Sequence, residues 1–222
     1  MPDPGQNKKI HHITHYSNLT SIIRMNGLYS SNILHTQDVT PTNIGHMSLK
    51  ERRGQHPVDL PPGGTLNDYV PFFLGPRPPM IIAIAKGSVA DYLRPQKEII
   101  YLVSSIQTIV NAGCLWCFTD GHAVEAITEY YNNLGNLVDL DWDAIYAFDF
   151  RPTSADPDRS RKKQAEFLVH RVVQWPYIES ITVKDIEMRN RVEEILNETH
   201  SPHRPTINIE RNWYYNPRGR QE

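Results

Sequence analysis

In this 222-residue chain, the residue whose type and position best suit it to catalysis is Glu166, in the segment Gln164-Ala-Glu-Phe-Leu-Val-His170. A charged stretch, 156–163, precedes it, and an apolar run, 167–173, follows it. The apolar run predicts a buried strand that begins near the glutamate. A carboxylate at the start of such a strand is well placed to lie at the rim of a cleft. Because Gln164 shares its face of the strand, the two polar side chains can hold a sugar and its nucleophile together.

Three histidines near the other end of the chain, His11, His12 and His15, raise the question of a metal site. Segment 10–14 is predicted to be a short strand, on which side chains alternate between faces. His12 and Thr14 then point to one side, and His11 and His15 to the other. A metal bound by all three histidines would need a bulge, so we expect no metal. One inward histidine that hydrogen-bonds a ligand remains an interpretation, and so does a structural role for all three.

Composition narrows the classes of partner. The formal net charge is −2, so the chain lacks a global positive field that would attract nucleic acid. Any nucleic-acid contact must therefore use local basic clusters, whose alternative interpretation is a solvated surface. The three clusters are Lys50, Arg52 and Arg53; residues 159–163; and Arg211, Arg218 and Arg220.

Neither of the glycine-rich phosphate loops, G-x-G-x-x-G or G-x-x-x-x-G-K, occurs in the sequence. No stretch of about 18 apolar residues is present, so we expect no membrane span. The first residues lack the apolar core of a signal peptide, and we therefore expect the protein in the cytoplasm.

The surrounding elements must position these residues. The predicted strands are 10–14, 99–103, 115–119, 165–173, 178–183 and 207–209, and the predicted helices are 46–53, 104–112, 123–134, 139–146 and 185–199. A further helix, capped by Ser17 or Asn18, is expected to stop at Gly27. The segment 68–80 is a strand broken by prolines, which predicts an edge strand or a bulge. Helices mixed with short strands, without regular βαβ alternation, favour an α+β fold.

Six segments together resemble a known family. In chain order they are His12-Ile-Thr-His-x-x-Asn18-Leu-x-x-Ile22-x-x-x-x-Gly27-Leu, Glu51-Arg-Arg53, Asp68-Tyr-Val-Pro-Phe, Pro76-Arg-x-Pro-Met80, Phe118-Thr-Asp-x-His122 and Gln164-Ala-Glu-Phe-Leu-Val. This order and spacing, from His11 to Tyr215, resemble the DarT family, the DNA ADP-ribosyltransferase toxins of DarT–DarG toxin–antitoxin pairs. A local difference is Leu74-Gly75, where relatives often carry an aromatic and a different small residue.

The resemblance implies a single ADP-ribosyltransferase domain over residues 1–222, with 1–9 flexible and a split central β-sheet flanked by helices. It implies transfer of ADP-ribose from NAD⁺ to a base in single-stranded DNA. Glu51-Arg-Arg53 resembles the thymidine-modifying branch, while another branch modifies guanosine. It further implies a macrodomain antitoxin partner, DarG, and we expect a monomer.

The resemblance also assigns residues to the NAD⁺ site. Glu166 and Arg53 would be catalytic: Glu166 would stabilise the cationic ribose, and Arg53 the negative charge on the base as its proton leaves. Glu166 would then take that proton. The residues expected to bind NAD⁺ are His12, Ile13, Thr14, Asn18, Leu28 and Arg53, with Tyr29 beside them.

Recognition of DNA requires an unpaired base turned out of its stack and an aromatic or cationic surface to receive it. The residues expected to contact DNA are Tyr69, Arg77, His122, Tyr146 and Arg161. Phe72, Trp116 and Phe148 are further stacking candidates. Arg161 is included because the family carries its substrate-recognition loop just before Glu166.

Two other functions fit parts of the pattern. An RNA 2′-phosphotransferase would also consume NAD⁺, but the carboxylate of Glu166 would repel its phosphate substrate. A non-catalytic module that binds single-stranded nucleic acid would bind DNA without releasing nicotinamide.

Overall fold

The computed structural model describes residues 7–215. Its strands are β1 Lys9–His15, β2 Gly27–Tyr29, β3 Tyr69–Phe73, β4 Ile99–Ser105, β5 Trp116–Thr119, β6 Tyr130–Tyr131, β7 Glu166–His170, β8 Val172–Gln174, β9 Ser180–Val183 and β10 Thr206–Ile209. Its α-helices are α1 Leu19–Arg24, α2 Ser31–Thr36, α3 Met47–Gln55, α4 Pro79–Ala85, α5 Ile106–Asn111, α6 Trp142–Tyr146, α7 Arg159–Lys162 and α8 Ile186–Glu198.

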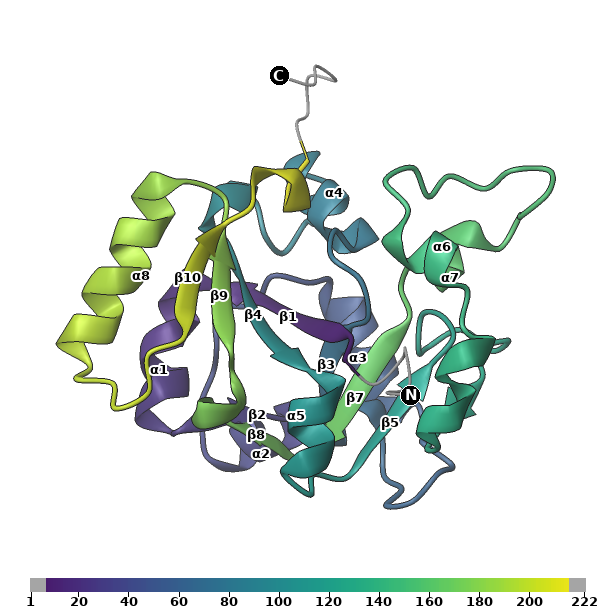
Figure 1. Cartoon of the computed structure of the whole chain (residues 1–222), viewed down its shortest axis with the longest axis horizontal. Coiled ribbons are helices and arrows are strands. Elements are labelled where there is room, and N and C mark those ends of the chain that lie inside the picture. Colours follow the sequence, from purple (N-terminus) through teal and green to yellow (C-terminus); the bar gives the residue numbers. More distant parts are fainter. Residues whose placement is uncertain (1–6, 216–222) are drawn as a thin grey trace.

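An eight-stranded sheet organises these elements, in the order β10-β9-β4-β1-β3-β7-β5-β6, with β2 and β8 as a separate pair (Figure 1). Neighbours in the sheet are antiparallel except β9 and β10, which run parallel. Helices α1 and α8 lie together beside β9 and β10, and α6 and α7 lie at the opposite end of the sheet (Figure 1). This arrangement confirms the predicted α+β class with flanking helices.

The sheet is split between β1 and β3. Strand β1 pairs with β4 along its whole length, from Lys9↔Ser105 to His15↔Ile99. With β3 it pairs only at His11↔Phe73, whereas β3 pairs with β7 at every residue. Beyond His11 the two halves of the sheet therefore diverge, and a space opens between them.

The prediction that the proline-broken strand lies at an edge is wrong, because β3 lies between β1 and β7. The N–H and C=O of one residue in a strand point to the same side. The carbonyl of Pro71 faces β1, where it accepts a hydrogen bond from the side chain of His12 at 2.8 Å. The missing N–H of the proline thus falls on the side where β1 and β3 do not pair. No hydrogen bond between β3 and β7 is lost.

Apolar side chains cover both faces of the sheet. On β4, Ile100 and Leu102 point into one apolar cluster, while Ile99, Tyr101 and Val103 point into a second. The first cluster fills the space between the sheet and helices α1, α5 and α8.

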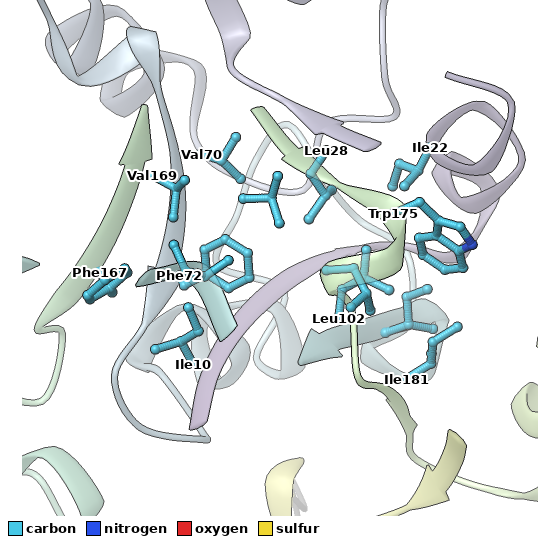
Figure 2. Packing of buried hydrophobic residues seen from close by; sticks show 14 of the residues in the cluster. Ile10, Ile22, Leu28, Val70, Phe72, Leu102, Phe167, Val169, Trp175 and Ile181 are labelled. Atoms are coloured by element: carbon cyan, nitrogen blue, oxygen red, sulfur yellow. The ribbon is translucent and has the colours of Figure 1, made fainter. Parts of the chain in front are cut away.

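Figure 2 shows part of the first cluster, in which side chains from strands distant in the sequence meet. Ile10, Phe72 and Phe167 lie together from β1, β3 and β7, and Trp175 lies beside Ile22 of α1 (Figure 2). The second cluster packs Ile81 and Ile84 of α4 and the buried ring of Tyr214 against the other face.

Two local predictions are corrected by the structure, the helix stop at Gly27 and the unbroken strand 165–173. Asn26, not Gly27, takes the left-handed conformation that ends α1, at φ 56°. Gly27 already belongs to β2, where an added Cβ would meet the Val173 carbonyl oxygen at 2.8 Å. The predicted strand 165–173 is divided into β7 and β8 by Arg171, at φ 67°.

The predicted helix 123–134 does not form. This segment is made of turns and of β6, which pairs with β5 through Thr119↔Tyr130 and Phe118↔Tyr131. The helix predicted at 139–146 begins only at Trp142, after a 3₁₀ helix at Leu134–Asp139. Tertiary pairing with β5 has overridden the local helical pattern.

Two expectations concern residues at the ends of the chain. Strand β1 begins at Lys9, inside the segment expected to be flexible, and residues 1–6 lie outside the described part of the chain. Arg218 and Arg220 of the third basic cluster also lie outside it. Within residues 7–215 no helix is both long and apolar enough to cross a membrane.

Candidate active site

A cavity of about 460 Å³ lies where β1 and β3 diverge. Its walls come from β1, α1, β2, the 39–46 loop, α3, β3 and the start of β7. The predicted site residues that line it are His12, Ile13, Thr14, Asn18, Leu28, Tyr29, Arg53, Tyr69, His122, Gln164 and Glu166. Residues from distant parts of the sequence are thus brought to one concave surface.

Glu166 begins β7 and is only 2% exposed. Its Oε1 accepts a hydrogen bond from the backbone N–H of Ala123 at 3.1 Å and from Arg53 Nη1 at 3.2 Å. Its Oε2 accepts from Arg53 Nη1 at 2.9 Å. A carboxylate can accept about four hydrogen bonds. Among the described residues, Glu166 therefore retains unused acceptor capacity on Oε2.

Arg53 projects from α3 and forms an ion pair with Glu166 that is largely withdrawn from solvent. Helix α3 is held against the 3₁₀ turn before β3, where Asn67 donates to the Lys50 carbonyl at 3.3 Å. Arg53 Nη2 is buried and has no hydrogen-bond partner within residues 7–215. A buried unpaired donor is costly. Nη2 is consequently suited to an acceptor on a ligand.

His12 is held in one tautomer. Its Nδ1 lies 2.8 Å from the Pro71 carbonyl oxygen, which can only accept, so Nδ1 carries the proton and Nε2 presents a lone pair. Burial lowers the pKa of His12, and the hydrogen bond to Pro71 opposes this only in part. The ring is therefore a neutral acceptor at pH 7.

The other two histidines of this strand serve elsewhere. His11 points to the opposite face, where Nδ1 donates to the Phe73 carbonyl at 3.2 Å and the ring packs edge-on against Trp213. His15 accepts the N–H of Ser17 at 3.2 Å on Nδ1 and donates from Nε2 to Glu98 at 2.9 Å. The predicted alternation of faces on β1 is confirmed.

Asn18 supports the wall of the cavity through hydrogen bonds within the protein. Its amide nitrogen donates to Thr14 Oγ1 and to the Thr42 carbonyl, both at 3.0 Å. Its amide oxygen accepts the Thr42 N–H at 2.8 Å. Asn18 thus ties the 39–46 loop to β1.

Two of the residues expected to contact DNA lie at the cavity. Tyr69 is buried and donates its hydroxyl to the Gly63 carbonyl at 2.8 Å. His122 precedes Ala123 and lies 3.5 Å from the carboxylate of Glu125. Their proposed contacts with a base stay predictions.

The other three lie outside the cavity. Arg77 is buried, with its guanidinium carbon 3.4 Å from the ring centre of Phe148 and 4.2 Å from that of Tyr215.

The half-exposed ring of Tyr146 lies against Trp142, with centres 5.9 Å apart. Arg161 is paired with two carboxylates, those of Asp120 and Asp158. Contact of these residues with DNA also remains a prediction.

The sequence interpretation missed one donor to the carboxylate of Glu166, the backbone N–H of Ala123. Tyr130 holds this residue in place, because its hydroxyl donates to the Ala123 carbonyl at 2.6 Å. Burial, together with the charge of Glu166, raises the pKa of Tyr130, which keeps the hydroxyl a donor. A backbone donor has no side-chain signature in a sequence.

Metal ligands are not grouped in this site. Within residues 7–215, no three side chains of His, Cys, Asp or Glu lie close enough together to hold an ion. The polar groups that line the cavity include the carboxylate of Glu166, the guanidinium of Arg53 and the neutral imidazole of His12.

Comparison with known proteins places the chain among DNA ADP-ribosyltransferases. Residues 11–215 match the family described as "ssDNA thymidine ADP-ribosyltransferase, DarT". The chain is 40% identical over 207 residues to the DNA ADP-ribosyl transferase of Thermus sp. (strain 2.9), covering 93% of this chain and 95% of that protein.

Solved structures agree in fold as well as in sequence. Thermus sp. 2.9 DarT in complex with ADP-ribosylated ssDNA superposes with a TM-score of 0.88 at 38% identity, over 94% of this chain and 97% of the other. The same protein in complex with NAD⁺ superposes with a TM-score of 0.83 at 37% identity, over 96% and 99%. The chain therefore belongs to the DarT family of single-stranded-DNA thymidine ADP-ribosyltransferases.

Proposed function

We propose that the Arg53–Glu166 pair is the centre at which this DNA ADP-ribosyltransferase transfers ADP-ribose from NAD⁺ to thymidine. The observation that carries the proposal is their geometry. A buried carboxylate and a largely buried guanidinium meet at the cavity that also holds His12, and each retains hydrogen-bonding capacity not used by residues 7–215. An ion pair with a merely structural role would be expected to use that capacity within the protein.

The cavity fits the ribose and nicotinamide of NAD⁺. The Nε2 lone pair of His12 can accept a ribose hydroxyl, and Glu166 Oε2 can accept a second one. Ile13 and Thr14 line the cavity, and their backbone would hold the nicotinamide amide. Asn18, Leu28 and Tyr29 line it as well. A related Thermus protein has been solved with NAD⁺ bound, which supports this assignment.

Glu166 would act first on the sugar. The bond between nicotinamide and ribose breaks, and nicotinamide leaves with the bonding electron pair. Positive charge then develops on the ribose, and a fixed carboxylate nearby lowers the energy of that state. The Ala123 N–H and Arg53 hold the carboxylate in one orientation, so little reorganisation is needed when the charge appears.

Arg53 would act on the acceptor. The ring nitrogen of thymine carries a proton at neutral pH and becomes nucleophilic only as that proton leaves. A guanidinium stays protonated and is therefore not the base. Its Nη2, which has no hydrogen-bond partner among residues 7–215, can donate to a carbonyl oxygen of thymine and stabilise the negative charge that forms there. Glu166 takes the proton as the new bond forms between the ring nitrogen and the ribose carbon.

The acceptor strand enters as an unpaired base, as enzymes that modify bases require. Tyr69 and His122 line the cavity and would contact the base. Arg77 and Tyr146 lie outside the cavity, and their expected contacts would be with the strand beyond the base. We further propose that the protein is one monomeric domain, acts in the cytoplasm and pairs with a DarG macrodomain antitoxin. Family membership supports the antitoxin partner.

Family membership also sets aside the two alternatives raised by the sequence. A carboxylate at the cavity suits a cationic sugar better than the phosphate of an RNA 2′-phosphotransferase substrate. A non-catalytic binding module does not fit membership of a family of ADP-ribosyltransferases.

Mass spectrometry of a defined single-stranded oligonucleotide, after incubation with NAD⁺, tests the proposal. We expect the wild-type protein to add one ADP-ribose on thymidine and to release nicotinamide. Glu166→Gln keeps the size of the side chain but removes its charge, so both products should be lost while the melting temperature shows a folded protein. Glu187→Gln, an exposed glutamate on α8, is the matched control.

Two outcomes would contradict the proposal. Wild-type rates in Glu166→Gln would remove the carboxylate from the mechanism. Efficient labelling of an oligonucleotide that lacks thymidine would reject thymidine as the acceptor of this chain.

A further inference from the structure

Arg161 has every N–H group occupied by another part of the protein. Nη1 and Nη2 donate to the two carboxylate oxygens of Asp120 at 2.8 and 3.0 Å. Nε and Nη2 donate to Asp158 at 2.9 and 2.6 Å. The second N–H of Nη1 donates to Thr128 Oγ1 at 3.1 Å. The guanidinium thus uses all the donors that an arginine has.

The local charge also argues against a phosphate at this place. One guanidinium faces two carboxylates, so the cluster of Arg161, Asp120 and Asp158 carries a net negative charge. A DNA phosphate would have to displace one carboxylate and then lie beside the other. This differs from the expectation that Arg161 contacts DNA.

The same residue holds the turn between β5 and β6. An added Cβ on Gly121 would lie 2.2 Å from Arg161 Nη1, so the guanidinium packs directly against this glycine. The backbone carbonyl of Arg161 accepts the N–H of His122 at 3.2 Å and that of Gln164 at 2.9 Å. Arg161 therefore joins the turn to the segment that leads into β7, through both its side chain and its backbone.

The turn held in this way carries two groups of the active site. The Ala123 N–H donates to Glu166 Oε1 at 3.1 Å, and His122 lies at the wall of the cavity. Thr128, which accepts from Arg161, donates in turn to the His122 carbonyl at 2.8 Å. A shift of the turn would move the Ala123 donor away from the carboxylate.

We propose that Arg161 is a positioning residue, which locks the segment 119–123 against the start of β7 and so fixes the orientation of the Glu166 carboxylate. Its contribution is to turnover and not to DNA affinity. The inference rests on the proposed role of Glu166. The variant Glu166→Gln, measured in the same assay, separates failure of that role from failure of this inference.

The test is steady-state kinetics of Arg161→Ala with a thymidine-containing oligonucleotide at several salt concentrations. A misplacement of about 1 Å can lower a rate by about a hundredfold, so we expect kcat to fall about ten- to a hundredfold. We expect the KM for the oligonucleotide and its dependence on salt to stay at wild-type values. Arg191→Ala, which removes an exposed ion-paired arginine on α8, is the matched control for loss of one positive charge.

Arg161→Lys distinguishes geometry from charge. Lysine cannot bind two carboxylates with a planar fork. A positioning role predicts that Arg161→Lys shows most of the kcat loss, whereas a charge contact with phosphate predicts recovery. The inference would be overturned if Arg161→Ala kept the wild-type kcat but had a raised KM for the oligonucleotide, with the slope of log KM against log salt concentration reduced by about one.

Gly121→Ala and Asp120→Asn keep the inference testable if Arg161→Ala does not fold. Each disturbs the same contact while the arginine and its charge remain. We expect a loss of kcat in both variants, with an unchanged KM for the oligonucleotide. Wild-type kcat in both would overturn the inference, provided that Glu166→Gln is inactive in the same assay.

Discussion

Arg53 Nη1 lies 2.9 Å from one carboxylate oxygen of Glu166 and 3.2 Å from the other, across 113 residues of sequence. The contact joins α3 to the first residue of β7 at the cavity between the two halves of the sheet. Burying two charges is costly, and a buried ion pair often adds little to stability. The ion pair is therefore better explained by a role in the site than by a contribution to stability. It fixes the orientation of the Glu166 carboxylate and of Arg53 Nη2.

Arg53→Lys should lower turnover with little effect on the KM for NAD⁺. Lysine keeps the positive charge beside Glu166 but has no second planar N–H group for the thymine oxygen. Loss of one such donor to developing negative charge lowers kcat by about 10²- to 10³-fold in other enzymes. Arg52→Lys, on the neighbouring exposed residue, is the matched control. Equal loss of NAD⁺ affinity and turnover would contradict this role.

Much of the fold follows from local sequence patterns. Ile186, Val192, Ile195 and Leu196 recur at helical spacing, and α8 forms there with Asp185 as its N-cap, accepting the Met188 N–H at 3.0 Å. The predicted strand 99–103 forms as part of β4, which is buried on both faces. These signals are short-range, and in both segments the tertiary contacts agree with them.

What local patterns missed depends on contacts between distant segments. Tyr130 and Tyr131 form β6 because β5 is available to pair with them. Pro71 is tolerated inside the sheet because β1 and β3 pair at one position only. The sequence contains no sign of either fact.

The site was predicted best where side-chain chemistry was decisive. Glu166, Arg53 and His12 line one cavity, as the resemblance implied. The Ala123 N–H was missed because a backbone donor is created by a turn and not by a residue type. The donors of Arg161 are taken up by Asp120 and Asp158, and a basic residue before a catalytic strand gives no indication of such partners.

His12→Phe should raise the KM for NAD⁺ by about fivefold, with a smaller effect on kcat. Phenylalanine fills the space beside Phe72 but lacks the Nε2 acceptor, and one hydrogen bond contributes about 1 kcal/mol. The measurement is the initial rate at varied NAD⁺ and saturating oligonucleotide. His11→Gln, one residue away on the opposite face of β1, is the control and should leave this KM unchanged. A fall in kcat at constant KM would contradict the assignment.

Asn18→Ala should weaken both the fold and NAD⁺ binding. The substitution leaves the Thr42 N–H and carbonyl without their partners, which should lower the free energy of unfolding by about 1–3 kcal/mol. The 39–46 loop would then lose its tie to β1, so the KM for NAD⁺ should rise. Urea unfolding and initial rates measure the two effects, with the exposed Asn197→Ala as the control. An unchanged stability would show that Thr42 finds other partners.

The stability of the protein should depend on pH through His11. Burial lowers the pKa of this histidine from 6.5 to about 4, the hydrogen bond to the Phe73 carbonyl opposes the shift, and the charges of Lys163 and Lys9 add to it. Between these two values the unfolded chain binds more protons than the folded one. The free energy of unfolding therefore rises with pH from about 4 to 6.5, by about 3 kcal/mol from this residue.

The variant His11→Gln isolates that contribution, because an amide can still donate to Phe73 but does not titrate. Urea unfolding of both proteins between pH 4 and 8 is the measurement. The difference in free energy of unfolding, wild type minus variant, should be constant above pH 6.5 and decrease by about 3 kcal/mol toward pH 4. Burial also lowers the pKa of His12 and of His170, but both titrate alike in the two proteins and cancel in the difference. Parallel curves for the two proteins would show that His11 binds its proton equally well in the folded and unfolded states.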